Sequence, residues 1–201
     1  SYRFKVGEEI TSMLKFTEFH RYPSFTKGTV YFYDGTATDG MLNYNFLIDE
    51  MQFLRGNDTL SLADEPTVKY IAIGKDTFLF HNKGYLRQLA TFDNKTLAVK
   101  EVLRILSVEN MGAYGLPVAA GSVDNIISIN DRKFTVNQDV ILALRISWWV
   151  GERKSFYPAN RKNVLKVFDK SPKEAGDYLD KVNFEKQDDL VQMFNRLSKG
   201  E

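Results

Sequence analysis

The chain has 201 residues, is 43% hydrophobic and 26% charged, and carries a formal net charge of +1. These values describe a globular chain of one domain, or one domain with an appended subdomain, that can build its own hydrophobic core. The small net charge creates no overall field toward polyanions, so we do not expect nucleic acid as a partner. The absence of cysteine excludes disulfides, thiolate nucleophiles and cysteine-bound metals. No run reaches the roughly 18 apolar residues of a transmembrane helix.

The residue pattern divides the chain into three parts. Residues 1–28 form an N-terminal segment that we expect to be partly irregular, with one short element. Residues 29–157 form an antiparallel β domain, because alternating runs are separated by Gly, Asn and Asp turns at intervals of roughly 8–12 residues. The predicted strands are Thr29–Tyr33, Leu42–Phe53, Thr59–Leu62, Val68–Ile73, Thr77–His81, Tyr85–Phe92, Thr96–Val108, Ile126–Ile129, Lys133–Val136 and Val140–Val150. The predicted fold class is mainly β, an antiparallel meander that forms a sandwich or barrel-like sheet.

The first two predicted strands surround a turn that is rich in aspartate and glycine. Two Asp-Gly pairs, at Asp34 and Asp39, bracket this turn. In the second strand Leu42, Tyr44, Phe46 and Ile48 share one face, and Asn43, Asn45 and Asp49 lie on the other. The apolar phase then slips to Met51 and Phe53. Since a slip of one residue exchanges the two faces of a strand, we predict a bulge or sharp bend near Asp49–Glu50.

Residues 158–201 are predicted to be a C-terminal tail of two or three short helices packed on the sheet. Val164, Leu165 and Phe168 share a helix face. The stretch Ser171–Glu174 has the N-cap serine, first-turn proline and glutamate of a helix start. The last helix carries acidic residues early and basic residues late, which complements its dipole. Its apolar face consists of Leu190, Met193, Phe194 and Leu197.

Several stretches share a characteristic pattern of strand and turn residues. They are Gly28–Gly35, Leu42–Phe53 and Tyr70–Phe78, and the pattern is approximated again at Gly112–Gly115, Pro158–Phe168 and Asn183–Asp189. In these stretches the chain resembles an uncharacterised family of exported proteins of Gram-negative bacteria, from about Tyr22 onward. The resemblance implies a periplasmic or cell-envelope location. It assigns no chemistry and supplies no site residues.

Aromatic and basic residues are interleaved just before the helical tail. Trp148, Trp149 and Tyr157 lie beside Arg153 in the sequence, and these four residues are the candidate binding site. Aromatic rings can stack on sugars or bases, and cations can hold anionic groups. Because neighbours on a strand face opposite ways, we expect one tryptophan to point outward. The same pattern also fits a strand followed by a solvated basic helix with no ligand. The Gly- and Pro-containing loop Asn110–Asn125 is a second candidate surface.

Other polar features are interpreted as structural. His20 and His81 are the only histidines, and neither has a partner near it in the sequence. The turn Asp34–Gly40 lacks the closing glutamate of a calcium loop. Asp49 and Glu50 are adjacent, so a regular strand would point them to opposite faces and separate them as a catalytic pair. We therefore expect no metal site and no cofactor.

Two hypotheses for function follow. The first is a non-catalytic cell-envelope protein that binds a protein partner or a glycan, since no catalytic motif is recognised. The second is a hydrolase whose site is assembled from distant carboxylates and His81. A cleft in which His81 or His20 meets a carboxylate would favour the enzyme. A flat surface that presents Trp148 or Trp149, with both histidines isolated, would favour the binding protein.

Overall fold

The computed structural model describes residues 1–108, 127–130, 133–170 and 176–199. The prediction of a mainly antiparallel β fold with C-terminal helices is confirmed in these ranges. The predicted loop Asn110–Asn125 and the predicted helix start Ser171–Glu174 lie outside them.

One large antiparallel sheet organises the described chain. Its strand order is β1-β12-β9-β8-β7-β6-β2-β3-β4-β5, β13 pairs with β12, and β10 and β11 form a separate pair. The order ends at β1 and β5 without pairing them, so the sheet is open. The strands are β1 (Tyr2–Phe4), β2 (Thr26–Phe32), β3 (Ala37–Asn45), β4 (Glu50–Arg55), β5 (Asp58–Ser61), β6 (Val68–Ile73), β7 (Asp76–Phe80), β8 (Tyr85–Phe92), β9 (Lys95–Val108), β10 (Ile127–Asn130), β11 (Lys133–Val136), β12 (Val140–Glu152) and β13 (Ser155–Pro158).

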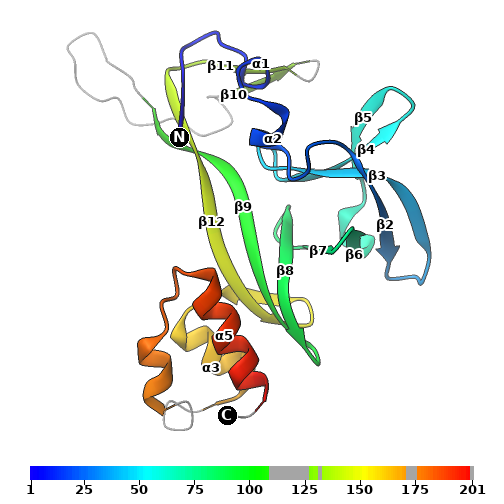
Figure 1. The fold of residues 1–201 in the computed structure, drawn as a ribbon. Coiled ribbons are helices and arrows are strands. Elements are labelled where there is room, and N and C mark those ends of the chain that lie inside the picture. Colours follow the sequence, from blue (N-terminus) through cyan, green and yellow to red (C-terminus); the bar gives the residue numbers. More distant parts are fainter. Residues whose placement is uncertain (109–126, 131–132, 171–175, 200–201) are drawn as a thin grey trace, which may run out of the picture.

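Helices lie at opposite ends of the sheet (Figure 1). The short helices α1 (Ile10–Met13) and α2 (Phe16–Phe19) lie near β3, β4 and the β10–β11 pair, and the 3-10 helix η1 (Glu65–Thr67) leads into β6. The other end carries α3 (Arg161–Phe168), the 3-10 helix η3 (Gly176–Lys181) and α5 (Gln187–Ser198). The predicted apolar face of α5 is buried, as expected. None of the helices in the described ranges is long and apolar enough to cross a membrane.

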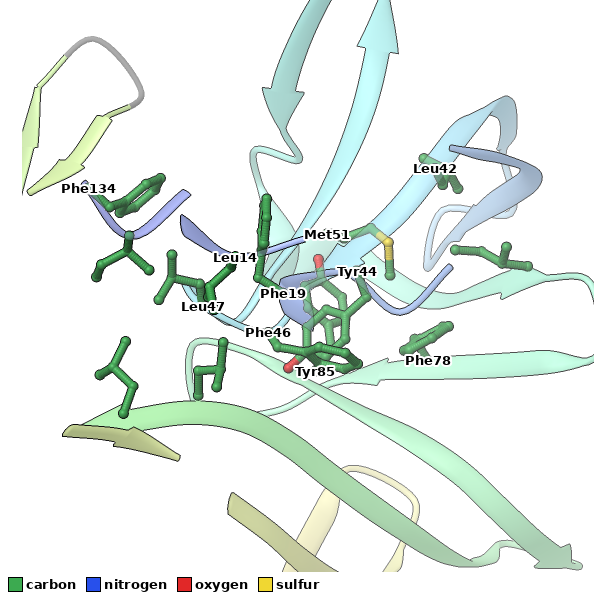
Figure 2. Close-up of a cluster of buried hydrophobic side chains, with 14 of the residues drawn as sticks. Leu14, Phe19, Leu42, Tyr44, Phe46, Leu47, Met51, Phe78, Tyr85 and Phe134 are labelled. Atoms are coloured by element: carbon green, nitrogen blue, oxygen red, sulfur yellow. The ribbon is translucent and has the colours of Figure 1, made fainter. Parts of the chain in front are cut away.

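The interior contains two main apolar clusters, and β9 and β12 contribute to both. The larger cluster lies among β3, β4, β7 and β8 and is aromatic: Tyr44, Phe78 and Tyr85 are buried, and the Tyr44 ring contacts the rings of both others (Figure 2). The second cluster joins Leu97 of β9 and Val150 of β12 to the apolar faces of α3 and α5. The long strands β9 and β12 therefore connect the two ends of the molecule.

The N-terminal segment covers the polar face of β3. Asn43 is fully buried: its Oδ1 accepts from the backbone N–H of Tyr22 at 3.0 Å, and its Nδ2 donates to the Tyr22 carbonyl at 2.9 Å. Asn45 is also buried, and the backbone of His20 forms an antiparallel bridge with it. From Leu42 to Asn45 both faces of this strand are therefore inside the protein, although the alternation there resembles that of a strand with one wet face.

The first turn is shorter than the sequence pattern indicates. β2 ends at Phe32 and β3 begins at Ala37, so Asp39 and Gly40 lie within a strand and pair with Thr29 and Gly28. The prediction that two Asp-Gly pairs bracket the turn is wrong for the second pair. The first pair closes the turn alone, because Asp34 Oδ1 accepts from the backbone N–H of Thr36 at 2.9 Å.

The bend predicted near Asp49–Glu50 is a full reversal of the chain. β3 ends at Asn45, the turn occupies the next four residues, and β4 begins at Glu50. Asp49 ends this turn in the left-handed region, with φ 61°. The slip in the apolar phase therefore marks two paired strands in place of one bulged strand.

Asp49 is buried and ties this turn to β8 and β9. Its Oδ1 accepts from the Tyr44 hydroxyl at 2.6 Å and from the backbone N–H of Tyr85 at 3.2 Å. Its Oδ2 lies 2.7 Å from the Lys100 ammonium. A side chain at Gly84 would overlap this carboxylate, so the close approach of the two turns requires glycine there. Burial, followed by the charge of the Asp49 carboxylate, raises the pKa of the Tyr44 hydroxyl.

Candidate binding groove

Neither tryptophan projects freely from the surface. Trp148 packs against the cluster formed by the C-terminal helices, and its Nε1 is buried without a hydrogen-bond partner among the described residues. Trp149 packs on the opposite side, against a small cluster that includes Phe156, and its Nε1 donates to Ser147 Oγ at 3.1 Å. The two rings do face opposite ways, but each face of β12 is covered here. The expectation of one outward tryptophan is therefore not met.

A groove of about 620 Å³ lies beside the turn between β12 and β13. It brings together two of the four residues suggested by the sequence, Arg153 and Tyr157, and excludes both tryptophans. The helix α3 adds Lys166 to the same groove. The lining residues are Glu152, Arg153, Lys154, Ser155, Tyr157, Lys166 and Val167.

The backbone fixes the turn that carries Arg153. Glu152 pairs with Ser155, which leaves Arg153 and Lys154 as the two turn residues. Arg153 has a φ of 55°, and its N–H donates to the carbonyl of Asn94 at 2.8 Å. Asn94 Nδ2 also donates to Glu152 Oε1 at 2.6 Å. Asn94, in the turn between β8 and β9, therefore holds the Arg153–Lys154 turn in place through two hydrogen bonds.

The helix α3 places Lys166 over the groove. Asn160 caps the helix by accepting from the N–H of Asn163 at 3.0 Å, and Val164 and Phe168 bury the inner face. Lys166 lies in the last turn, where a cation complements the helix dipole. Its ammonium lies 4.2 Å from the centre of the Tyr157 ring, a cation–π contact.

The groove collects cations that no described carboxylate neutralises. Arg153, Lys154 and Lys166 form no salt bridge with the described residues, and the carboxylate of Glu152 is occupied by Asn94. The Lys154 ammonium lies 3.6 Å from the centre of the Tyr33 ring, which is a π contact as well. Three cations and one carboxylate therefore line a concave surface. Such a surface attracts anionic groups.

Other basic residues of the tail do not join the groove. Arg161 forms a salt bridge with Asp180 of η3, and Lys162 is exposed outside the groove. The sequence pattern alone could not separate these residues from Lys166. Helical spacing does not distinguish Lys162 either, because it lies four residues before Lys166 on the same side of α3. Lys166 differs in its place along the helix, since it lies in the last turn and contacts the Tyr157 ring.

His81 lies among aromatic rings. Its ring is 5.1 Å from that of Trp149 and 5.5 Å from that of Phe156. Its Nε2 is buried without a hydrogen-bond partner in the described ranges. Burial, followed by the charge of Lys100, lowers the pKa of this imidazole. His81 therefore bonds to no carboxylate of the described residues that could orient it as a general base.

His20 is 5% exposed and bonds to an amide. Its Nε2 lies 2.9 Å from Gln52 Oε1, and its ring stacks on Phe16 with centres 4.0 Å apart. Burial lowers the pKa of the imidazole. Among the residues that the structure describes, no group of three or more His, Asp and Glu side chains could hold a metal ion.

Comparisons with protein-family models, with curated proteins and with solved structures found no match.

Proposed function

We propose that this protein is a non-catalytic binding protein that holds an acidic glycan in the groove beside the β12–β13 turn. One observation carries the proposal: Arg153, Lys154 and Lys166 converge on a concave surface without a described carboxylate to neutralise them. Carboxylate groups of a sugar chain would neutralise these charges through charge-assisted hydrogen bonds.

The size of the groove favours a glycan over a protein surface. About 620 Å³ lies within the range of sites that hold small molecules or short oligomers. A stable protein interface needs roughly 800 Å² from each partner, and it is usually built around exposed aromatic anchors. Trp148 and Trp149 are half-buried and do not provide such anchors.

A hydrolase is the weaker alternative. His81 contacts aromatic rings, and His20 bonds to Gln52, so neither histidine is paired with a described carboxylate. The resemblance to exported proteins of Gram-negative bacteria supports a cell-envelope location for the binding activity. Cell fractionation of the source organism tests that location.

The binding experiment uses trigalacturonate as an acidic glycan and maltotriose as its neutral counterpart, measured by calorimetry. The triple variant Arg153→Gly, Lys154→Gln, Lys166→Gln removes the charges and keeps a residue that accepts positive φ in the turn. We expect trigalacturonate affinity to fall roughly tenfold or more in this variant. Maltotriose should not compete.

Lys162→Gln on α3 is the matched control, because it removes one exposed lysine of the same helix outside the groove. Its affinity should equal that of the unmodified protein. The control is compared with the single variant Lys166→Gln. An equal loss of trigalacturonate affinity in both would show that the groove is not the site. Hexaglutamate that binds as tightly as trigalacturonate would replace the glycan with an acidic protein segment.

A further inference from the structure

A cleft lies at the end of the sheet opposite the C-terminal helices. It has a volume of about 450 Å³ and lies between the N-terminal helices and the hairpin of β4 and β5. This end of the molecule carries α1, α2, β4 and β5 in Figure 1. The lining residues are Thr11, Phe19, His20, Asn45, Ile48, Glu50, Gln52, Thr59, Leu60, Ser61 and Phe134.

A chain of hydrogen bonds fixes the orientation of the Gln52 amide. The backbone N–H of Leu47 donates at 2.9 Å to Asn45 Oδ1, which identifies that atom as the oxygen. Asn45 Nδ2 must then be the donor of the 3.2 Å bond to Gln52 Oε1. His20 Nε2, 2.9 Å from the same oxygen, must also donate. The imidazole therefore carries a proton on Nε2, and Gln52 presents its oxygen to the protein.

The same network leaves the other half of the Gln52 side chain free. Gln52 is half-buried, it lines the cleft, and its Nε2 donates to no described residue. Two amide N–H groups are thus available to an acceptor from outside. His20 Nδ1 is buried and has no hydrogen-bond partner in the described chain either. The Gln52 amide is therefore bonded toward the core through its oxygen, and among the described residues it is unbonded through its N–H₂ group, which is an arrangement expected of a ligand site.

Glu50 supplies acceptors to the same cleft. Its Oε2 accepts from the hydroxyl of Ser61 across the β4–β5 hairpin, which orients the carboxylate. Its Oε1 accepts no hydrogen bond from a described residue. Thr59 adds a hydroxyl beside it. The cleft therefore combines an oriented donor and an oriented acceptor on one strand, β4.

The rest of the lining is apolar and aromatic. Phe19 and Phe134, both labelled in Figure 2, contribute rings, and Ile48 and Leu60 contribute aliphatic surface. No lysine or arginine of the described chain lines the cleft. It therefore differs from the groove at the other end in both charge and surface character.

We propose that this cleft is a second ligand site, and that it takes a neutral carbohydrate. A sugar hydroxyl both donates and accepts, so adjacent hydroxyls can accept from Gln52 Nε2 and donate to Glu50. The C–H faces of the ring would pack on Phe19 and Phe134. A volume of about 450 Å³ accommodates a ligand of the size of a disaccharide.

Other ligand classes fit less well. An anion would face the charge of Glu50, and no lysine or arginine among the described lining residues would offset it. An ammonium group would suit Glu50, but it has no acceptor for the Gln52 amide. An apolar ligand would bury both polar groups without partners, at a cost in free energy.

His20 is not placed to act as a general base toward a ligand in the cleft. His20 donates from Nε2 to Gln52, and its free lone pair on Nδ1 is buried, so it cannot take a proton from a ligand. The proposal rests on residues that are separate from the groove. Either site can fail its test without affecting the other.

The test is ligand-detected NMR with maltose, cellobiose and chitobiose at up to about 20 mM, followed by titration of the best binder. The variant Gln52→Glu keeps an oxygen for His20 and Asn45 and replaces the free N–H₂ with a second oxygen. We expect its affinity for the disaccharide to fall roughly tenfold. Glu50→Gln should weaken binding to a similar extent, while its side chain can still bond to Ser61.

Gln88→Glu is the matched control, since it makes the same change on the half-buried face of β8, outside the cleft. Its affinity should equal that of the unmodified protein, and thermal melting confirms that each variant is folded. The proposal is overturned if none of the three disaccharides binds, or if Gln52→Glu and Gln88→Glu bind equally well. Binding of ethanolamine in preference to every disaccharide would also overturn it, in favour of an amine site.

Discussion

The cleft near α2 and the groove beside the β12–β13 turn hold their polar groups in different ways. In the cleft, Asn45 and His20 are almost fully buried and bond to the half-buried Gln52. In the groove, Arg153 and Lys154 are exposed on a two-residue turn. The cleft is bordered by residues of the larger apolar cluster, such as Phe19 and Phe134. The groove lies on the surface next to the second cluster, which contributes Val167 to its lining.

This difference determines what each site can recognise. Buried and oriented groups select a ligand by the position of its hydroxyls, because an unmatched donor or acceptor there is costly. Exposed cations attract any anion of suitable spacing, and their effect is screened by salt. Changes to the cleft should therefore affect stability as well as binding, while changes to the groove should affect binding alone.

Removing the carboxylate of Asp49 should produce the largest effect. Asp49→Ala leaves the half-buried Lys100 ammonium, whose side chain is only 13% exposed, without this partner, and it frees the turn that precedes Glu50 and from which Ile48 reaches the cleft. We expect the free energy of unfolding to fall by about 3–5 kcal/mol in urea denaturation. Hydrogen exchange should accelerate in β3 and β4 before it does in β13.

Asp39→Ala provides the control for this change. Asp39 is exposed and accepts from the Thr29 hydroxyl at 2.6 Å, so its loss should cost no more than about 1 kcal/mol. Similar losses for Asp49→Ala and Asp39→Ala would contradict the supporting role assigned to Asp49.

The second-largest effect should be a difference between the two sites in how ligand affinity depends on salt concentration. Raising the sodium chloride concentration from about 50 to 500 mM shortens the screening length, so trigalacturonate affinity in the groove should fall by roughly threefold to tenfold. Disaccharide affinity in the cleft should change by less than about twofold, because its ligand is neutral. Calorimetry at both concentrations measures the two effects. Equal salt dependence would remove the electrostatic distinction between the sites.

Lowering the pH should reduce the stability of the folded protein, and His20 beside the cleft should contribute to this loss. Burial lowers the pKa of His20 in the folded protein, so the unfolded chain takes up the proton first as pH falls below about 6.5. Stability should therefore decrease from about pH 7.5 to 5.5, by at most about 1.4 kcal/mol per pH unit for this one proton.

The variant His20→Gln tests the assignment. It should reduce the pH dependence without abolishing it, since the lowered pKa of His81 makes a contribution of the same sign. Urea denaturation at several pH values measures the slope. An unchanged slope in this variant would show that His20 is not one of the responsible groups.

The smallest effect is expected from Trp149. Its ring packs against Phe156 and His81 and does not line the groove, so Trp149→Phe should leave trigalacturonate affinity within about twofold of the original. Calorimetry provides the measurement. A tenfold loss of trigalacturonate affinity would show that Trp149 belongs to the binding site and that the cations contribute less than proposed.

The strands and the last helix could be predicted from the sequence because their signals are local. Alternation gave Val68–Ile73 and Tyr85–Phe92 with the observed bounds, and helical spacing identified the buried face of α5. Gly40 was assigned to a turn because an Asp-Gly pair is a local turn signal, yet pairing with Gly28 keeps it in a strand. Tertiary pairing thus overrode the local preference there.

The two sites were harder to predict from the sequence, because they depend on contacts between distant segments. Arg153 and Tyr157 were found from their neighbourhood in the sequence, but the covering of Trp148 by helices was not. The cleft was missed altogether, since its walls come from α2, β4, β5 and β11. Only one local signal pointed to it: Asn43 and Asn45 occupy a strand face that proves to be buried under the N-terminal segment.

The pairing of β1 with β12 also bears on how the chain is made. Tyr2 pairs with Leu142, which is synthesised 142 − 2 = 140 residues later. At a translation rate of about 5–20 residues per second, the partner strand is synthesised roughly 7 to 28 seconds after the first strand. Contacts of this sequence separation also slow folding. The completed sheet, and with it the pairing that holds Phe4 in the core, is therefore a late event in the life of each new molecule.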